Sequence, residues 1–174
     1  MRKLLTLMAR FRWAALSLSL GGLAGCGLHP LYQGGTSSPA AIGLQSVEVA
    51  QIPQRAGWLT RNALVDRLGG EHPAGLYRLE VELDDNITGS GIRSDSATTR
   101  ERRTLRARYR LVEQASGAVL LDATAGSDAG IDVVSSEYAT VAAEQTAVER
   151  LSGVVADQIV ARLARYVTAM SKRP

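Results

Sequence analysis

The sequence is poor in the residues that cross-link small proteins or bind metals. Its 174 residues include one cysteine, two histidines, one phenylalanine and two tryptophans. A single cysteine excludes an internal disulfide, and neither His29 nor His72 has other ligand residues at the spacing of a metal site. With so few aromatic side chains, the hydrophobic core must be largely aliphatic. We therefore expect a fold that depends on its core, without a metal.

The sequence also lacks a recognisable catalytic set. No Gly-rich phosphate loop follows a strand pattern, and neither histidine accompanies a nucleophile and an orienting carboxylate. The acid pairs Glu80/Glu82 and Asp84/Asp85 fall in an alternating stretch, where a solvated strand face is the usual explanation. These absences predict a protein that is not an enzyme and needs no cofactor.

The only cysteine, Cys26, ends a short apolar segment that follows a basic N-terminus. The apolar stretch over 13–23 has 11 residues, about half of what a membrane-spanning helix needs. A charged head, a short apolar core and small residues before a cleavage point are typical of a secretory signal peptide. Because the segment ends in Leu23-Ala24-Gly25-Cys26, it resembles the lipobox of bacterial lipoproteins, whose cysteine is acylated. We predict a signal peptide at residues 1–25 and a lipid anchor on Cys26; a signal peptide with an incidental cysteine is the alternative.

Removal of the leader changes the charge of the protein. The full chain has 20 Lys and Arg against 17 Asp and Glu, and the leader carries four of the basic residues and none of the acids. Residues 26–174 therefore have 16 basic and 17 acidic side chains, a formal charge of −1. The basic character of the whole chain belongs to the leader, so it does not indicate a nucleic-acid partner.

The remaining residues divide into a tether, one domain and a short tail. Residues 26–41 are rich in Gly, Ser, Thr and Pro, which is typical of a linker. The pattern of a folded domain extends over 42–168, long enough to bury a sizeable core, and 169–174 form a basic tail.

Hydrophobic periodicity predicts the elements of this domain. In chain order we expect a strand over 42–49, a helix over 55–68, and strands over 77–84, 103–112 and 118–125. The alternation is clearest over 77–84, where apolar residues alternate with charged ones. Residues 85–99 form either a long hairpin connection or a continuation of both flanking strands.

A single long helix is expected after the last strand. Ser135 or Ser136 should cap it, and it should end near Tyr166. Its apolar residues lie three, four or seven apart, as in a stripe that packs on a sheet. The members of the stripe are Tyr138, Val141, Val148, Leu151, Val155, Ile159, Leu163 and Tyr166. The element order predicts an α+β fold: a two-layer sandwich, with a mostly antiparallel four-stranded sheet and two helices on one face.

Six arginines crowd into one predicted strand and the segment before it, at positions 100, 102, 103, 106, 108 and 110. Those in the middle of the strand should pair with the acidic face of 77–84. Acids are fewer after Asp85, so the arginines near the hairpin tip should be the least neutralised. Arginine binds phosphate bidentately, which suggests an anion-binding cluster. Its predicted members are Arg100, Arg102, Arg103 and Arg106.

Several short segments resemble the LptE family of lipopolysaccharide (LPS) assembly lipoproteins. These segments are Gly25 to Tyr32 around the lipobox, Arg61-Asn62, Gly91-Ile92-Arg93 and Ser136-Glu137-Tyr138-Ala139. The resemblance implies an outer-membrane lipoprotein on the periplasmic side, which plugs the LptD β-barrel and aids LPS transport and outer-membrane assembly. It also gives the arginine cluster a ligand, the phosphates of lipid A. An auxiliary lipoprotein of a lipid-trafficking ABC transporter is the alternative function.

Overall fold

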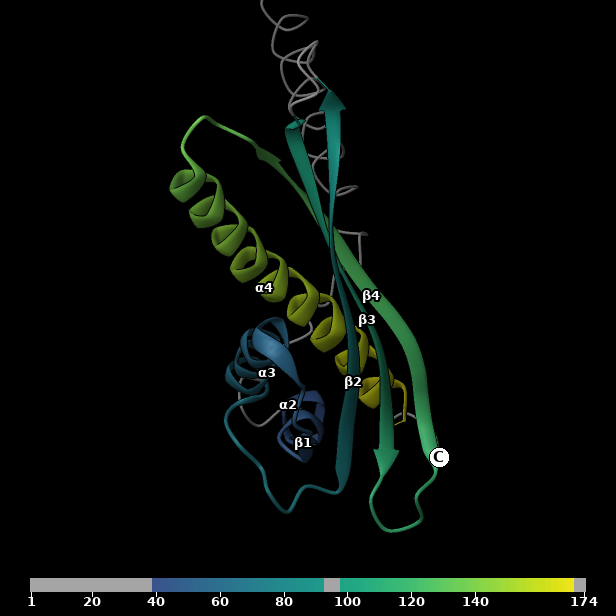
Figure 1. Ribbon diagram of the computed structural model, residues 1–174. Helices are drawn as coiled ribbons and strands as arrows, with labels where there is room; N and C mark the ends of the chain where they lie inside the picture. The colour runs from purple at the N-terminus through teal and green to yellow at the C-terminus, as the bar shows by residue number, and fades with distance from the viewer. Residues whose placement is uncertain (1–38, 93–97, 171–174) are drawn as a thin grey trace, which may run out of the picture. The chain divides into compact units, whose positions relative to one another are not determined.

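The computed structural model describes residues 39–92 and 98–170, which form three helices and four strands (Figure 1). In chain order these are α2 (Pro39–Leu44), β1 (Val47–Val49), α3 (Gln54–Leu68), β2 (Tyr77–Ile92), β3 (Thr98–Glu113), β4 (Val119–Asp132) and α4 (Glu137–Met170). Cys26, the tether as far as residue 38 and the last four residues of the tail lie outside the described residues.

The four strands form one sheet in the order β1-β2-β3-β4. β1 pairs with β2 in parallel through the register Val47↔Tyr77, and the other two pairs are antiparallel. The helices lie on one side of this sheet, with α4 running obliquely across it (Figure 1). The predicted α+β class and the mostly antiparallel four-stranded sheet are confirmed. The helices number three rather than two in the described part of the chain.

The extra helix, α2, occupies the boundary where a tether and a strand were predicted. Residues 39–44 are helical, so the strand predicted from residue 42 is confined to β1, at Val47–Val49. Pro39 suits the first position of a helix, where its missing N–H costs nothing. Leu44 is buried, and a Cβ on Gly43 would overlap the Val167 side chain of α4. Docking against α4 therefore stabilises a helix too short to persist alone.

α3 has the predicted extent and the predicted end. Gly69 follows it in the left-handed conformation, with φ 93°, and the N–H of Gly70 bonds to the carbonyl of Val65. The residues that it buries include Ala56, Thr60 and Leu64. Trp58 points away from them and is 62% exposed.

The three long strands extend further than the alternation indicated. β2 continues to Ile92 and β3 begins at Thr98, so residues 85–99 largely continue both strands. β4 runs to Asp132, seven residues beyond the predicted end at residue 125 and past Gly126 and Gly130. β4 is an edge strand, and its Gly126 is bonded by a side chain of α4 rather than by another strand. The N–H of Gly126 donates to Gln158 Oε1 at 3.1 Å, and Gln158 Nε2 donates to the Gly126 carbonyl at 3.2 Å.

The core lies between the sheet and α4. The predicted helix stripe from Val148 to Leu163 is buried, and it meets aliphatic residues and one tyrosine of the sheet. The buried sheet residues at this interface include Leu79, Val81, Leu105, Ala107, Tyr109 and Leu111. Ser136 caps α4 as predicted, since its Oγ accepts from the N–H of Ala139 at 3.4 Å.

The first two members of the predicted stripe do not pack on the sheet. Tyr138 is 85% exposed and Val141 is 43% exposed, whereas Val148 is 2% exposed. The prediction was wrong here because periodicity shows which side of a helix is apolar, but not how much of the helix the sheet covers. Within residues 39–92 and 98–170, no helix combines the length and apolarity that crossing a membrane requires.

Candidate functional site

The arginines of β3 are divided between the two faces of the sheet. Leu105, Ala107 and Tyr109 are buried toward the helices, so the even-numbered residues point to the opposite, outer face. That face carries Arg100, Arg102, Arg106, Arg108 and Arg110. Arg103 shares the helix side with Leu105. The cluster that is continuous in sequence is therefore not one site in space.

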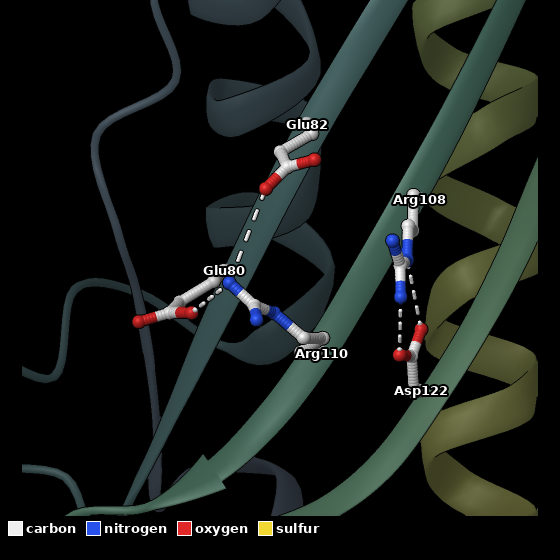
Figure 2. A network of polar contacts seen from close by, with 5 residues as sticks. All are labelled: Glu80, Glu82, Arg108, Arg110 and Asp122. Atoms are coloured by element: carbon white, nitrogen blue, oxygen red, sulfur yellow. Dashed lines mark hydrogen bonds and ion pairs between the residues drawn. The ribbon is translucent and has the colours of Figure 1, made fainter.

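In the middle of the outer face, arginines pair with acids from both neighbouring strands (Figure 2). Arg110 Nη2 lies 3.1 Å from Glu80 Oε2 and 3.9 Å from Glu82 Oε1. This pairing confirms the predicted charge ladder between β2 and β3. Arg108 was expected to pair with β2 as well, but it binds Asp122 of β4 at 2.8 and 3.3 Å. Its hydrogen bonds lower the pKa of the Asp122 carboxyl, and those bonds raise the pKa of Arg108.

The arginines nearest the hairpin tip are also paired, contrary to the expectation that they would be least neutralised. Arg100 Nε lies 3.2 Å from Asp132 Oδ1, and Arg102 Nη1 lies 3.4 Å from Asp128 Oδ2. Both acids belong to the part of β4 that sequence reasoning missed. All four side chains are more than half exposed, so each pair stabilises the fold by less than about 1 kcal/mol.

Arg103 is held on the helix side of the sheet. Its Nε and Nη2 donate to the two carboxylate oxygens of Asp85 at 2.8 and 2.5 Å, and its Nη1 donates to the Glu144 carbonyl of α4 at 2.9 Å. The Arg103 and Asp85 side chains are only 15% and 16% exposed. The hydrogen bonds to Asp85 outweigh the desolvation of the guanidinium and raise the pKa of Arg103. Arg103 thus joins β2, β3 and α4, which is a structural role.

Arg106 differs from the other three members of the predicted cluster. It is exposed and lies opposite Asp84 and Gly126, but it has no carboxylate within 4.0 Å in the described part of the chain. A Cβ on Gly126 would lie 3.4 Å from Arg106 Cγ, so the arginine stem passes over the glycine. Arg106 lines a trough of about 560 Å³. Residues of β2 and β4 and Gln158 of α4 also line this trough.

The outer face as a whole is close to electrically balanced. By register it presents six arginines and seven carboxylates. The arginines are Arg78, Arg100, Arg102, Arg106, Arg108 and Arg110, and the acids are Glu48, Glu80, Glu82, Asp84, Asp122, Asp128 and Asp132. A charged ligand there has to compete with internal ion pairs. Among the described residues, no group of three or more His, Cys, Asp and Glu could hold a metal ion.

Solved structures of bacterial lipoproteins share this fold. A lipoprotein from Caulobacter crescentus is 26% identical, with a TM-score of 0.61 over 74% of this chain and 96% of that one. Rare lipoprotein B from Shewanella oneidensis is 9% identical, with a TM-score of 0.56 over 72% and 96% of the two chains. Lipoprotein B from Nitrosomonas europaea is 13% identical, with a TM-score of 0.55 over 71% and 84%.

No curated protein sequence matches this chain. Residues 44–163 match the model of the LptE family, which is described as a lipopolysaccharide-assembly family. That range begins at the last residue of α2, includes every strand of the sheet and ends within α4. Since the match covers more than half of the chain, the protein belongs to the LptE lipopolysaccharide-assembly family.

Proposed function

We propose that this protein is a non-enzymatic outer-membrane lipoprotein that binds and plugs an LptD-type β-barrel, aiding LPS transport and outer-membrane assembly. The observation that carries the proposal is the family match over 44–163, which spans the whole sheet. The fold supports it too, because solved structures of bacterial lipoproteins share this architecture.

Co-purification tests the proposed partner. The tagged full-length lipoprotein, solubilised from membranes in mild detergent, is expected to bring down a large β-barrel protein in about equal amounts. The alternative function, an auxiliary lipoprotein of an ABC transporter, predicts inner-membrane transporter subunits instead. Mass spectrometry of the captured proteins separates these outcomes. Transporter subunits without a barrel would contradict the proposal.

The anchor is tested at Cys26. We expect thiol acylation of Cys26 to attach the mature protein to the membrane, so Cys26→Ala should leave an unprocessed or soluble precursor. A single acyl chain binds membranes only marginally, and lipoprotein processing supplies the several chains that stable anchoring needs. Membrane fractionation with the barrel depleted is the measurement. Cys26→Ala protein that still sediments with the outer membrane would disprove the anchor.

Direct contact with LPS remains a prediction. Of the predicted cluster, Arg106 is the arginine best placed to make that contact. Arg100 and Arg102 are exposed but paired, and Arg103 would have to give up Asp85 and Glu144. Arg106→Gln is expected to weaken LPS binding by about 1 kcal/mol, roughly fivefold, because one exposed phosphate contact is lost. Binding should also weaken as salt rises.

The matched control for Arg106→Gln is Arg110→Gln on the same face. Arg110 is paired with Glu80 and Glu82, so Arg110→Gln should lower the melting temperature. Its effect on LPS binding should be smaller than that of Arg106→Gln. The measurements are LPS co-purification and thermal melting at two salt concentrations. Unchanged LPS binding by Arg106→Gln would assign the entire outer face to stability.

A further inference from the structure

Four exposed apolar side chains, three near the start of α4 and one on β2, are here called the distal patch. Its members are Ile87, Val134, Tyr138 and Val141, with exposed fractions of 38%, 50%, 85% and 43%. Ile87 pairs with Arg103, and Arg103 bonds to Glu144 of α4, so β2, β3 and α4 are joined at this level. Ile87 therefore lies on the helix side of the sheet, near the level of the first turns of α4.

Beside Ile87 of the distal patch, one carboxylate oxygen has no partner among the described residues. Glu101 is on the helix side of β3, two residues from Arg103, between Gly89 of β2 and Ile131 of β4. Its Oε2 is shielded from solvent, yet it has no hydrogen bond within residues 39–92 and 98–170. Desolvation of an unpaired carboxylate opposes folding, and buried polar atoms are nearly always paired. Within the described residues Glu101 Oε2 therefore has no donor, and another molecule could supply one.

The charge around Glu101 favours a cationic donor. The described segments around it, 85–92, 98–104 and 127–144, contain six carboxylates and three arginines. All three arginines, Arg100, Arg102 and Arg103, are already in ion pairs with acids of these segments. This end of the domain is therefore net negative, which opposes lipid phosphates and anionic membrane surfaces and attracts Lys or Arg side chains.

We propose that the distal patch and Glu101 together form a docking surface for a segment of the partner protein that presents a Lys or Arg flanked by apolar side chains. The cation would pair with Glu101, and the apolar residues would cover Tyr138 and Val141. A few buried aromatic residues commonly dominate the binding energy of an interface, and Tyr138 is the aromatic anchor here. Identification of this partner as the β-barrel rests on the proposed function.

Site-specific photo-cross-linking locates the partner. A photoreactive residue placed at Tyr138 or Val141 of the full-length lipoprotein is expected to cross-link to the barrel, at a peptide that contains Lys or Arg. The matched control is Trp58, an equally conspicuous exposed aromatic residue on α3. Cross-links from position 58 but not from 138 or 141 would overturn the proposal, and so would cross-links from 138 only to a second copy of this chain.

Glu101 variants test the charge. Glu101→Gln should lower the amount of co-purified barrel several-fold, and Glu101→Lys roughly tenfold or more, because a desolvated charge pair is lost or reversed. The melting temperature of the lipoprotein without its partner should stay equal or rise in Glu101→Gln, since an unpaired charge is removed. A residue with a purely structural role would not lose binding while keeping stability. Asp84→Lys, on the outer face, is the charge-reversal control and should bind normally.

Two further outcomes decide the origin of the cation. If the cross-linked Lys or Arg of the barrel is changed to Glu, Glu101→Arg should restore co-purification. If Arg93→Gln instead lowers the melting temperature and Glu101→Gln does the same, the cation belongs to this chain and the proposal is wrong. A wild-type protein that captures no barrel would contradict the proposed function itself. If the Glu101 and Tyr138 variants capture as much barrel as the wild-type protein does, only this inference is contradicted.

Discussion

Val155→Asp is expected to abolish folding of the domain. Val155 is 0% exposed and lies in the core cluster between α4 and the sheet. None of the described residues buried there is a cation, so the new carboxylate would be desolvated without a partner, at a cost of several kcal/mol. Domains of this size are stable by only about 5–15 kcal/mol. The lost packing of the valine side chain adds to the cost of the buried charge, so most molecules should be unfolded. Far-UV circular dichroism and thermal melting of the full-length protein in detergent measure the effect.

The neighbouring residue provides a matched control. Val154 is on the same turn of α4 but is 36% exposed, so Val154→Asp introduces the same charge at a position that water reaches. We expect Val154→Asp to lower stability by less than about 1 kcal/mol, as most surface substitutions do. Similar melting temperatures for the two variants would show that the buried face of α4 has been assigned wrongly.

Arg103→Leu should produce the second largest loss, about 2–4 kcal/mol in the free energy of unfolding. The substitution leaves the Asp85 carboxylate without its bidentate partner in a site where it is only 16% exposed, and it removes the donor to the Glu144 carbonyl. Truncation of one member of a shielded ion pair costs more than the pair contributes, because the remaining charge stays desolvated. Urea unfolding measures the difference.

Two substitutions make the interpretation of Arg103→Leu specific. Arg103→Lys keeps the charge but cannot form the bidentate fork, so its loss should be intermediate. Arg102→Leu removes an arginine from an exposed pair with Asp128 and should cost less than about 1 kcal/mol. If Arg102→Leu and Arg103→Leu destabilise the protein equally, the contrast between the two faces of β3 is incorrect.

The elements that could be predicted from sequence are those with strong local periodicity. Alternation placed the cores of β2 and β3, and the apolar stripe placed α4 from Val148 to Leu163. The end of α3 was also readable, since Gly69 is required where the chain turns left-handed. In each case the signal lies within a few residues of the structure it specifies.

The rest depends on pairing across long stretches of chain. The second half of β4 contains Gly126 and Gly130, which disfavour a strand locally, yet hydrogen bonding to β3 keeps it extended. That extension brings Asp128 and Asp132 beside Arg102 and Arg100. The tip arginines were expected to be unpaired because only the acids of β2 were considered. Similarly, α2 is helical because it docks on α4, a contact that its six residues cannot encode.

The bond between Gln158 and Gly126 has a consequence for the behaviour of the protein at high concentration. An edge strand offers its free N–H and C=O groups to any other extended chain, and this is a common route to aggregation. The Gln158 amide takes both groups of Gly126, in the middle of the β4 edge. An incoming strand therefore finds two short segments instead of one continuous template. A single side chain of the helix layer thus acts as a gatekeeper against intermolecular sheet growth.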